Sequence, residues 1–474
     1  MVRLPQEQRF LSEALLATPV PGRNGTVELV VTLDVGPRIL AYGRPAGPPK
    51  EAAPPAVSPP PRSAESTRAG IRVPPGFRVE LVAAEPDVLD PVAFDWDVQG
   101  RLWVVEMADY PSGMDGKGSA GGRVRVLSDT DGDGRFETSR LFAEGLSFPN
   151  GILCWRDGAI VTAAPQILEL RDTDGDGRCD SREPLIEGFM EGNQQLRVNG
   201  LRWGLDGMVW CASGGHHAGH GAKTVVRSRA GGREYAIGSH DFRFDPDTGE
   251  IVLESGPSQY GRCRDAFGHW FGTQNANPLW HWVLADRALA RNPYVPAGTS
   301  IRHLVGPNSP PVHPASPPEK RFHSFDQAGR FTSACGSTIY GDTVLFPAGG
   351  PLHAFTCEPF HNLIQHNLLA DDGPSFVASR PEGEGPTDFF ASDDRWCRPV
   401  MARTGPDGCL WVADMYRFMI EHPDWLPPEG RAELLPHYRL GDDKGRIWRI
   451  VRDAAPPRGF PAAVRDPPGL CRRV

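Results

Sequence analysis

The chain has 474 residues, of which 39% are hydrophobic and 23% are charged, and its net charge is −9. This length allows one large all-β domain or two to three ordinary domains. The acidic balance argues against nucleic acid as the main partner, because binding phosphate groups requires an excess of Lys and Arg. The sequence contains no apolar run long enough to predict a transmembrane helix, and residues 1–20 lack the apolar core of a secretory signal.

Four segments follow one another along the chain. Residues 1–44 predict a β-hairpin fragment, because apolar residues alternate from Val27 to Val31 before a Val-Gly-Pro turn. Residues 45–70 are rich in Pro and Ala, which favours an extended linker. Residues 71–452 carry the main domain, and residues 453–474 predict a disordered tail rich in Pro and Arg.

The main domain repeats one pattern: a strand, a turn such as Asp-Gly, and a second apolar strand of the Leu-Trp-Val-Val kind. Four copies occupy residues 90–110, 197–215, 261–281 and 398–416, and looser copies begin at Phe148 and Phe331. Short strands with turn chemistry repeated in register are typical of a propeller, so six copies predict an all-β, six-bladed β-propeller. We expect residues 77–84 to pair with residues 445–451, which leaves no open sheet edge. An irregular two-sheet sandwich is the alternative.

Two Asp-rich loops indicate calcium. Carboxylates at alternate positions of a tight turn supply the hard oxygen ligands that calcium prefers, and the glycine after the third Asp permits the bend. The first loop offers Asp129, Asp131 and Asp133, with Glu137 at its ninth position and Arg140 at its twelfth. The second loop matches the full calcium-loop pattern, and its ligand candidates are Asp172, Asp174, Asp176, Asp180 and Glu183.

These loops lack the flanking amphipathic helices of an EF-hand, so we interpret them as turns between outer blade strands. There calcium would stabilise the fold and would not take part in catalysis. The alternative is a pair of solvated Asp-Gly turns without metal.

Other candidates lie where a propeller's inner strands meet its channel. His216, His217 and His220 share a Gly-rich loop, and His217 is the candidate base. Arginines, amides and flat aromatic rings together suit a planar anionic ligand; the residues concerned are Asn199, Arg262, Arg264, Gln274, Asn275 and Trp280. Arg398 and Arg417 complete the catalytic candidates. The alternatives are a polar surface loop for the histidines and packing between blades for the aromatic residues.

The chain resembles the membrane-bound dehydrogenases of planctomycetes and related bacteria, and in particular their glucose/sorbosone-dehydrogenase-type propeller. The resemblance rests on segments spread across residues 71–452; they include VNGLRWGLDGMVWCASGGHH, GPSQYGRCRDAFGHWFGTQN, DFFASDDRWCRPVMARTGPDG and WVADMYRFMIEHPDWLP. It implies oxidation of a sugar or a related alcohol or aldehyde, with pyrroloquinoline quinone (PQQ) and Ca²⁺ as cofactors. It also implies a periplasmic or cell-envelope location. No short motif carries the family's base or cofactor ligands onto individual residues here.

Two features depart from the family's pattern: no C-x-x-C-H haem motif follows the propeller, and the amino end resembles only a fragment of an upstream module. Electrons would therefore pass to a separate acceptor such as a cytochrome c. Two other interpretations of the function stay open. One is a calcium-braced propeller without catalysis that binds a glycan or a protein, and the other is a calcium-dependent lactonase-type hydrolase. Channel arginines would favour the quinone, whereas a channel lined with neutral polar and aromatic groups would favour binding.

Overall fold

The computed structural model describes residues 15–21, 27–33, 59–215, 223–292, 294, 300–306, 308–316, 328–426 and 428–459. The chain divides into two compact units, residues 1–56 and residues 57–474. Within the described part of the chain, no helix has the length and apolar character needed to cross a membrane.

The described residues of the first unit form one antiparallel hairpin. Its strands are β1 (Leu15–Pro21) and β2 (Val27–Leu33), and Leu15 pairs with Leu33. The hairpin was expected to place its second strand after the Val-Gly-Pro turn, and in the structure β2 pairs with β1, which precedes it. That turn lies outside the described residues.

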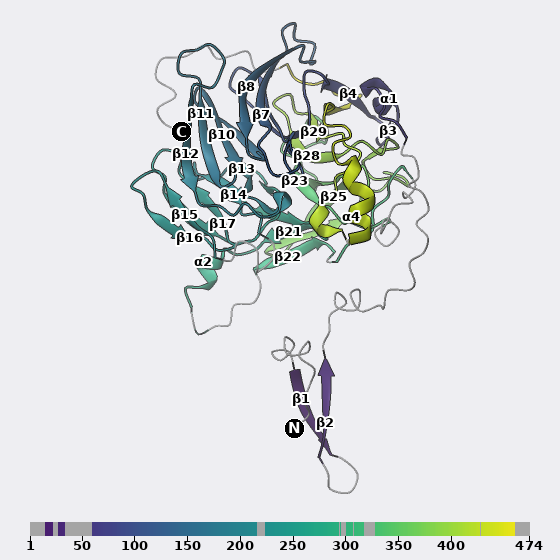
Figure 1. Ribbon diagram of the computed structural model, residues 1–474. Coiled ribbons are helices and arrows are strands. Elements are labelled where there is room, and N and C mark those ends of the chain that lie inside the picture. The colour runs from purple at the N-terminus through teal and green to yellow at the C-terminus, as the bar shows by residue number, and fades with distance from the viewer. Residues whose placement is uncertain are drawn as a thin grey trace. The chain divides into compact units, whose positions relative to one another are not determined.

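The second unit is a six-bladed β-propeller, as predicted, and each blade is an antiparallel sheet (Figure 1). Blade 1 consists of β5 (Pro91–Trp96), β6 (Leu102–Glu106), β7 (Gly122–Ser128) and β8 (Thr138–Leu146). Blade 2 consists of β9 (Gly151–Trp155), β10 (Gly158–Ala163), β11 (Gln166–Arg171) and β12 (Ser181–Glu187), extended by β15 (Val225–Ser228) and β16 (Glu234–Ala236). Blade 3 consists of β13 (Asn199–Trp203), β14 (Val209–Ala212), β17 (Asp241–Phe244) and β18 (Ile251–Glu254).

Blade 4 consists of β19 (Arg262–Arg264), β20 (Trp270–Gln274), β21 (Asn277–Trp282) and β22 (Ile301–Val305). Blade 5 consists of β23 (Cys335–Ile339), β24 (Leu352–Glu358), β25 (Leu363–Asp372), β26 (Ser375–Ser379), β27 (Phe390–Ser392) and β3 (Ile71–Arg72). Blade 6 consists of β28 (Pro399–Thr404), β29 (Leu410–Asp414), β30 (Arg446–Arg452) and β4 (Phe77–Ala84).

The first strands of the blades form a closed inner ring. In ring order, β5 contacts β9, β9 contacts β13, β13 contacts β19, β19 contacts β23, β23 contacts β28, and β28 contacts β5. The predicted closure is confirmed, because β4 pairs with β30 from Arg78 opposite Val451 to Ala84 opposite Arg446. Each of the six sequence copies contributes the first two strands of one blade.

The repeated Asp and Trp of the sequence copies have a shared structural role. In three blades a carboxylate in the first turn accepts a hydrogen bond from the indole Nε1 of the second strand; the pairs are Asp97 with Trp103 (2.9 Å), Asp206 with Trp210 (3.2 Å) and Asp407 with Trp411 (2.9 Å). This bond fixes the turn against the buried strand that follows. The second strands β6 and β29 are buried along their whole length, since neighbouring blades cover both faces of each sheet.

Short helices lie outside the sheets: α1 (Ala64–Ala69), η2 (Gln194–Leu196), α2 (Asp286–Leu289), η3 (Pro423–Trp425), α4 (Pro428–Leu434) and η4 (Leu435–His437). The expected helical segments near 282–291 and 415–435 are thus present. Helix α1 falls within the stretch that the composition assigned to the linker, and it contacts β4.

The antiparallel order gives the channel two different ends. Loops that lead into the first strand of a blade lie at the same end as loops between its second and third strands. We call this end the mouth. Turns between the third and fourth strands lie at the opposite end.

Candidate functional site

A cavity of about 270 Å³ lies at the mouth of the channel. Its lining comes from segments that precede the inner strands, such as Gln259 and Thr332, and from segments that follow the second strands, such as Met107 and Met415. We call it the mouth cavity. Segments next to blades 1, 3, 4, 5 and 6 meet there, so residues far apart in sequence converge on one space.

Residues 415–426, which follow β29, line one side of the mouth cavity and are fixed to η2. His422 donates from Nε2 to the side-chain oxygen of Gln194 (2.6 Å). Its Nδ1 accepts from the Asn193 amide (2.9 Å) and from the backbone N–H of Asp424 (3.2 Å). These partners assign the neutral Nε2–H tautomer. Burial lowers the pKa of His422 to about 4, which agrees with a neutral ring.

Tyr110 and Gln195 complete this wall. The Tyr110 hydroxyl donates to the Ile420 carbonyl (2.6 Å) and accepts from Gln195 Nε2 (2.8 Å). Gln195 Oε1 accepts from the indole of Trp425 (2.7 Å). Both polar ends of Gln195 are therefore used within the protein, and the hydrogen bonds that join Tyr110, Gln195 and Trp425 are all between uncharged groups.

Four other side chains keep hydrogen-bonding groups that no described residue uses. They are the amide nitrogens of Gln194 and Gln259, the side-chain amide of Asn275 and the hydroxyl of Thr332. The second polar end of Gln259 is occupied, because its Oε1 accepts from the Asn275 backbone N–H (3.1 Å). The site thus offers amide donors, an amide acceptor and one hydroxyl to a ligand.

The rest of the lining is mainly apolar. It includes Val92, Met107, Phe360, Val400, Met415 and Ile420. Among the described lining residues, Glu421 is the single charged side chain. A cavity with a few uncharged polar groups set in an apolar wall suits a small molecule that has both polar and apolar faces.

Tyr260 forms the floor of the mouth cavity. It precedes β19 in blade 4, and its hydroxyl donates across the channel to the carbonyl of Val92 in blade 1 (2.9 Å). The Asn150 carbonyl, which leads into blade 2, is a second and longer acceptor at 3.4 Å. Burial raises the pKa of the Tyr260 phenol, so the hydroxyl keeps its proton and its donor role.

The predicted planar-ligand residues do not gather around this cavity. Arg262 lies between blades, where its guanidinium packs against the rings of Trp210, Trp270 and Trp282 at 5.2–5.5 Å. It pairs there with the buried carboxylate of Asp241 (3.0 Å). The alternative interpretation of the aromatic residues, packing between blades, therefore describes this cluster.

The other members of that group have local partners. The Asn199 side chain donates to the Gln259 carbonyl (2.7 Å) and accepts from the Gly261 N–H (2.7 Å), which joins blade 3 to blade 4. Arg264 donates to the carbonyls of Trp203 and Asp265, Gln274 accepts from Asn277, and Trp280 is buried beside Trp282. Of the predicted group, only Asn275 lines the mouth cavity.

Two of the predicted catalytic residues are buried behind the cavity wall. Arg398 donates to the carbonyls of Pro359 (3.0 Å), Arg417 (2.9 Å) and Phe418 (2.6 Å). Arg417 forms two bonds with the carboxylate of Asp90, at 2.5 and 2.8 Å, and neither partner is exposed. Both arginines hold backbone at the mouth, and neither lines the cavity. His217 lies outside the described residues.

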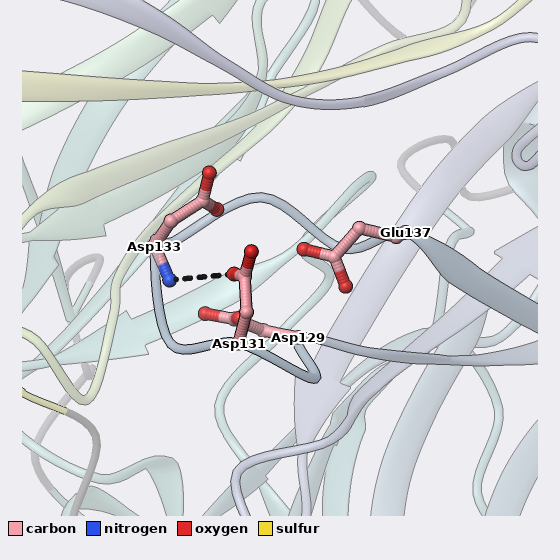
Figure 2. A group of neighbouring side chains, drawn as sticks. All are labelled: Asp129, Asp131, Asp133 and Glu137. Carbon is pink, nitrogen blue, oxygen red and sulfur yellow. Dashed lines mark hydrogen bonds between the residues drawn. The ribbon is translucent and has the colours of Figure 1, made fainter.

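The two Asp-rich loops lie at the opposite end of the channel. The first joins β7 to β8, the outer two strands of blade 1, as predicted, and the second joins β11 to β12, the third and fourth strands of blade 2, beyond which β15 and β16 extend the sheet. Figure 2 shows Asp129, Asp131, Asp133 and Glu137 around the first turn. One oxygen of each of these four carboxylates lies within 4.8 Å of the others, and Asp172, Asp174 and Asp176 gather in the same way.

Both loops use the same hydrogen bonds. The first Asp accepts from two backbone N–H groups, at 2.6 and 2.8 Å for Asp129 and at 2.7 and 2.9 Å for Asp172. The ninth residue accepts from a threonine N–H, at 3.0 Å for Glu137 and at 2.7 Å for Asp180. The twelfth positions differ. Glu183 lies on β12 and pairs with Arg229 (2.9 Å), whereas Arg140 donates to the Asp176 carbonyl of the neighbouring loop (2.9 Å).

Sequence reasoning missed Gln194, Gln259 and Thr332. Each shortly precedes an inner strand, and polar residues at the start of a repeat are expected to line one mouth of a propeller. The position of the stretches EGNQQL, GPSQYG and FTSAC before inner strands could have identified these residues. Because they are uncharged, however, they are less obvious site residues than arginines and histidines.

Several solved structures are similar to this chain at low sequence identity. An oxidoreductase (glucose dehydrogenase) from Thermus thermophilus is 14% identical, with 79% of this chain and 100% of that chain covered and a TM-score of 0.46. The PQQ-bound aldose sugar dehydrogenase of Streptomyces coelicolor is 13% identical, with 80% and 99% covered and a TM-score of 0.40. An auxiliary nutrient binding protein of Bacteroides ovatus is 9% identical, with 80% and 76% covered and a TM-score of 0.43.

These neighbours differ in function, and at such similarity no activity is transferred from any of them. No curated protein matches the sequence. A family described as "Domain of unknown function (DUF7133)" matches residues 63–454, which include every blade of the propeller. The chain therefore belongs to the DUF7133 family.

Proposed function

We propose that the protein binds an uncharged, hydroxyl-bearing small molecule of the sugar type in the mouth cavity. The observation that carries this proposal is the set of unused groups on Gln194, Gln259, Asn275 and Thr332, all uncharged, facing an apolar wall. A sugar presents hydroxyl groups that both donate and accept, and its C–H faces pack on apolar and aromatic side chains. Phe360 and the half-exposed Trp425 supply such surfaces.

If the protein also oxidised the bound sugar with PQQ, it would be a PQQ-dependent dehydrogenase, and we call this possibility the catalytic extension. The described residues do not fit PQQ. PQQ carries three carboxylates, which require cationic partners. The described lining of the mouth cavity contains no Arg or Lys, and Arg262, Arg398 and Arg417 are engaged elsewhere. We therefore derive no hydride transfer. A lactonase-type metal centre would need several acidic ligands in the channel, and the described lining offers one.

The experiment is a calorimetric titration of the full chain with a panel of neutral mono- and disaccharides. The variant Asn275→Ala removes an unused amide from the cavity, and we expect it to weaken binding at least tenfold. Gln274→Ala is the matched control, because Gln274 occupies the same turn and its side chain is bonded to Asn277 (2.6 Å). We expect that control to bind as the wild type does.

A parallel titration with PQQ and calcium, followed by dye reduction with the same sugars, tests the catalytic extension. Stoichiometric PQQ binding with sugar-dependent dye reduction would replace the binding proposal by the dehydrogenase. Failure of every sugar to bind, or equal binding by both variants, would contradict the proposed site.

A further inference from the structure

Trp425 lies at the opening of the mouth cavity. It is 45% exposed, and every other described residue of the cavity lining is less exposed. The floor of the cavity, in contrast, is formed by Tyr260, whose hydroxyl is bonded across the channel to Val92. The indole ring of Trp425 is therefore placed where the cavity meets solvent.

The Trp425 ring is held in one orientation. Its Nε1 donates to Gln195 Oε1 (2.7 Å), and Gln195 Nε2 donates to the hydroxyl of Tyr110 (2.8 Å). Tyr110 is buried and donates in turn to the carbonyl of Ile420 (2.6 Å). This chain of hydrogen bonds ties one edge of the ring to the buried wall and leaves part of the ring surface open. A fixed aromatic ring binds a ligand at a low cost in conformational entropy.

Asp424 supplies a second exposed group at the same opening. Its Oδ2 accepts from the amide of Asn193 (3.2 Å), which caps the short helix η2, and Trp425 is bonded to Gln195 within that helix. The Asp424 side chain is 60% exposed, and its Oδ1 accepts no hydrogen bond from any described residue. Adjacent residues thus present an aromatic surface and an unused carboxylate oxygen along η2.

The volume of the mouth cavity limits how much of a sugar lies below this opening. Its 270 Å³ falls just under the range of about 300–1,000 Å³ that accommodates drug-sized ligands. One sugar ring fills such a space, and a second ring joined to it has to lie outside, at the opening. Trp425 and Asp424 are the exposed side chains that a second ring meets there.

We propose that the ligand is the end of an oligosaccharide, with its terminal ring in the mouth cavity and the next ring against Trp425 and Asp424. This inference rests on the proposed function and narrows the ligand from a sugar to an oligosaccharide. A sugar ring has C–H groups on its faces, which pack on an aromatic ring, and hydroxyl groups around its edge. A hydroxyl that donates to a carboxylate forms a short, strong hydrogen bond, and Asp424 Oδ1 is free to accept one.

The test is a calorimetric titration of the full chain with glucose, mannose and xylose, each beside its β-1,4-linked disaccharide, and with maltose. We expect at least one disaccharide to bind tenfold more tightly than its own monosaccharide. Trp425→Ala should remove this advantage and leave the affinity for the monosaccharide within threefold of the wild type. Asp424→Asn should weaken the disaccharide about threefold and leave the monosaccharide unchanged.

Two further variants separate stacking from support of the wall. Trp425→Phe keeps an aromatic ring but loses the bond to Gln195, and it should retain most of the advantage of the disaccharide. Leu435→Ala is the control, because Leu435 is 57% exposed in the same connection between β29 and β30 but does not line the cavity; it should bind both sugars as the wild type does.

The outcomes distinguish this inference from the function on which it rests. If none of these sugars binds, the proposed function fails and the inference fails with it. If monosaccharides bind and no disaccharide binds more tightly, only the inference is overturned. It is also overturned if Trp425→Ala weakens the monosaccharide and the disaccharide equally and Trp425→Phe restores neither, because Trp425 then only supports the wall.

Discussion

The two ends of the channel are stabilised by different kinds of interaction. At the mouth, residues 415–426 depend on buried groups: the Arg417–Asp90 ion pair and the uncharged hydrogen bonds of His422. At the opposite end, the Asp-rich loops are largely exposed, and their carboxylates accept mostly from the backbone of their own turn. Buried interactions fix one geometry regardless of the medium, whereas exposed carboxylates respond to cations and salt. We therefore expect the site at the mouth to be preformed, and the geometry of the Asp-rich loops at the other end to change with cations and salt.

The largest expected effect is at the mouth. Arg417→Met leaves the Asp90 carboxylate buried without a partner, and we expect a loss of about 3–5 kcal/mol of unfolding free energy. Arg101→Met is the control at the opposite end, where Arg101 is 40% exposed and pairs with Asp97. That loss should stay below about 1 kcal/mol. Urea denaturation measures both, and equal losses would remove the distinction between the two ends.

An intermediate effect should appear when the pH is lowered. An unperturbed histidine has a pKa of about 6.5, and burial lowers that of His422 to about 4. Between these values the unfolded chain binds more protons than the folded one, so stability falls as the pH drops from about 6.5 to 4. The loss through His422 should be about 2–3 kcal/mol, at roughly 1.4 kcal/mol per pKa unit.

Other buried histidines titrate in the same window, because burial lowers the pKa of His281 and His353 to about 4 as well. The informative quantity is therefore the difference between the wild type and His422→Gln in urea denaturation at pH 7, 5.5 and 4. The variant should lose less stability on acidification. Parallel pH profiles would show that His422 titrates normally in the folded protein.

The smallest effect should be that of calcium at the Asp-rich loops, which we propose as its sites. One site contributes about 1.4 kcal/mol at a calcium concentration tenfold above its dissociation constant. Asp131→Asn and Asp174→Asn are matched changes, because each carboxylate accepts from one backbone N–H at 3.1 Å and little structure depends on it. Each should remove part of the calcium-dependent rise in melting temperature, and the double variant should remove all of it. A full rise in the double variant would mean that the loops are solvated turns.

The blades were predictable because their signals are local. The turn carboxylate and the Trp of the next strand recur at short spacing, and the structure joins them by a hydrogen bond in three blades. The site was much less predictable. Arg262 and Asn275 both belong to blade 4, yet one side chain packs in the layer between blades and the other lines the mouth cavity. That choice depends on the position of a single residue along a strand and on the partners offered by distant blades, which one sequence does not reveal.

The pairing of β4 with β30 has a consequence for synthesis of the chain. Phe77 pairs with Arg452, so strand β4 emerges from the ribosome and then waits for about 370 residues before its partner is made. At 5–20 residues per second this takes roughly 20–70 s. During that interval β4 exposes unpaired backbone groups that any other extended chain could join. The blade that seals the finished ring is therefore the one most open to misassembly while the protein is being made.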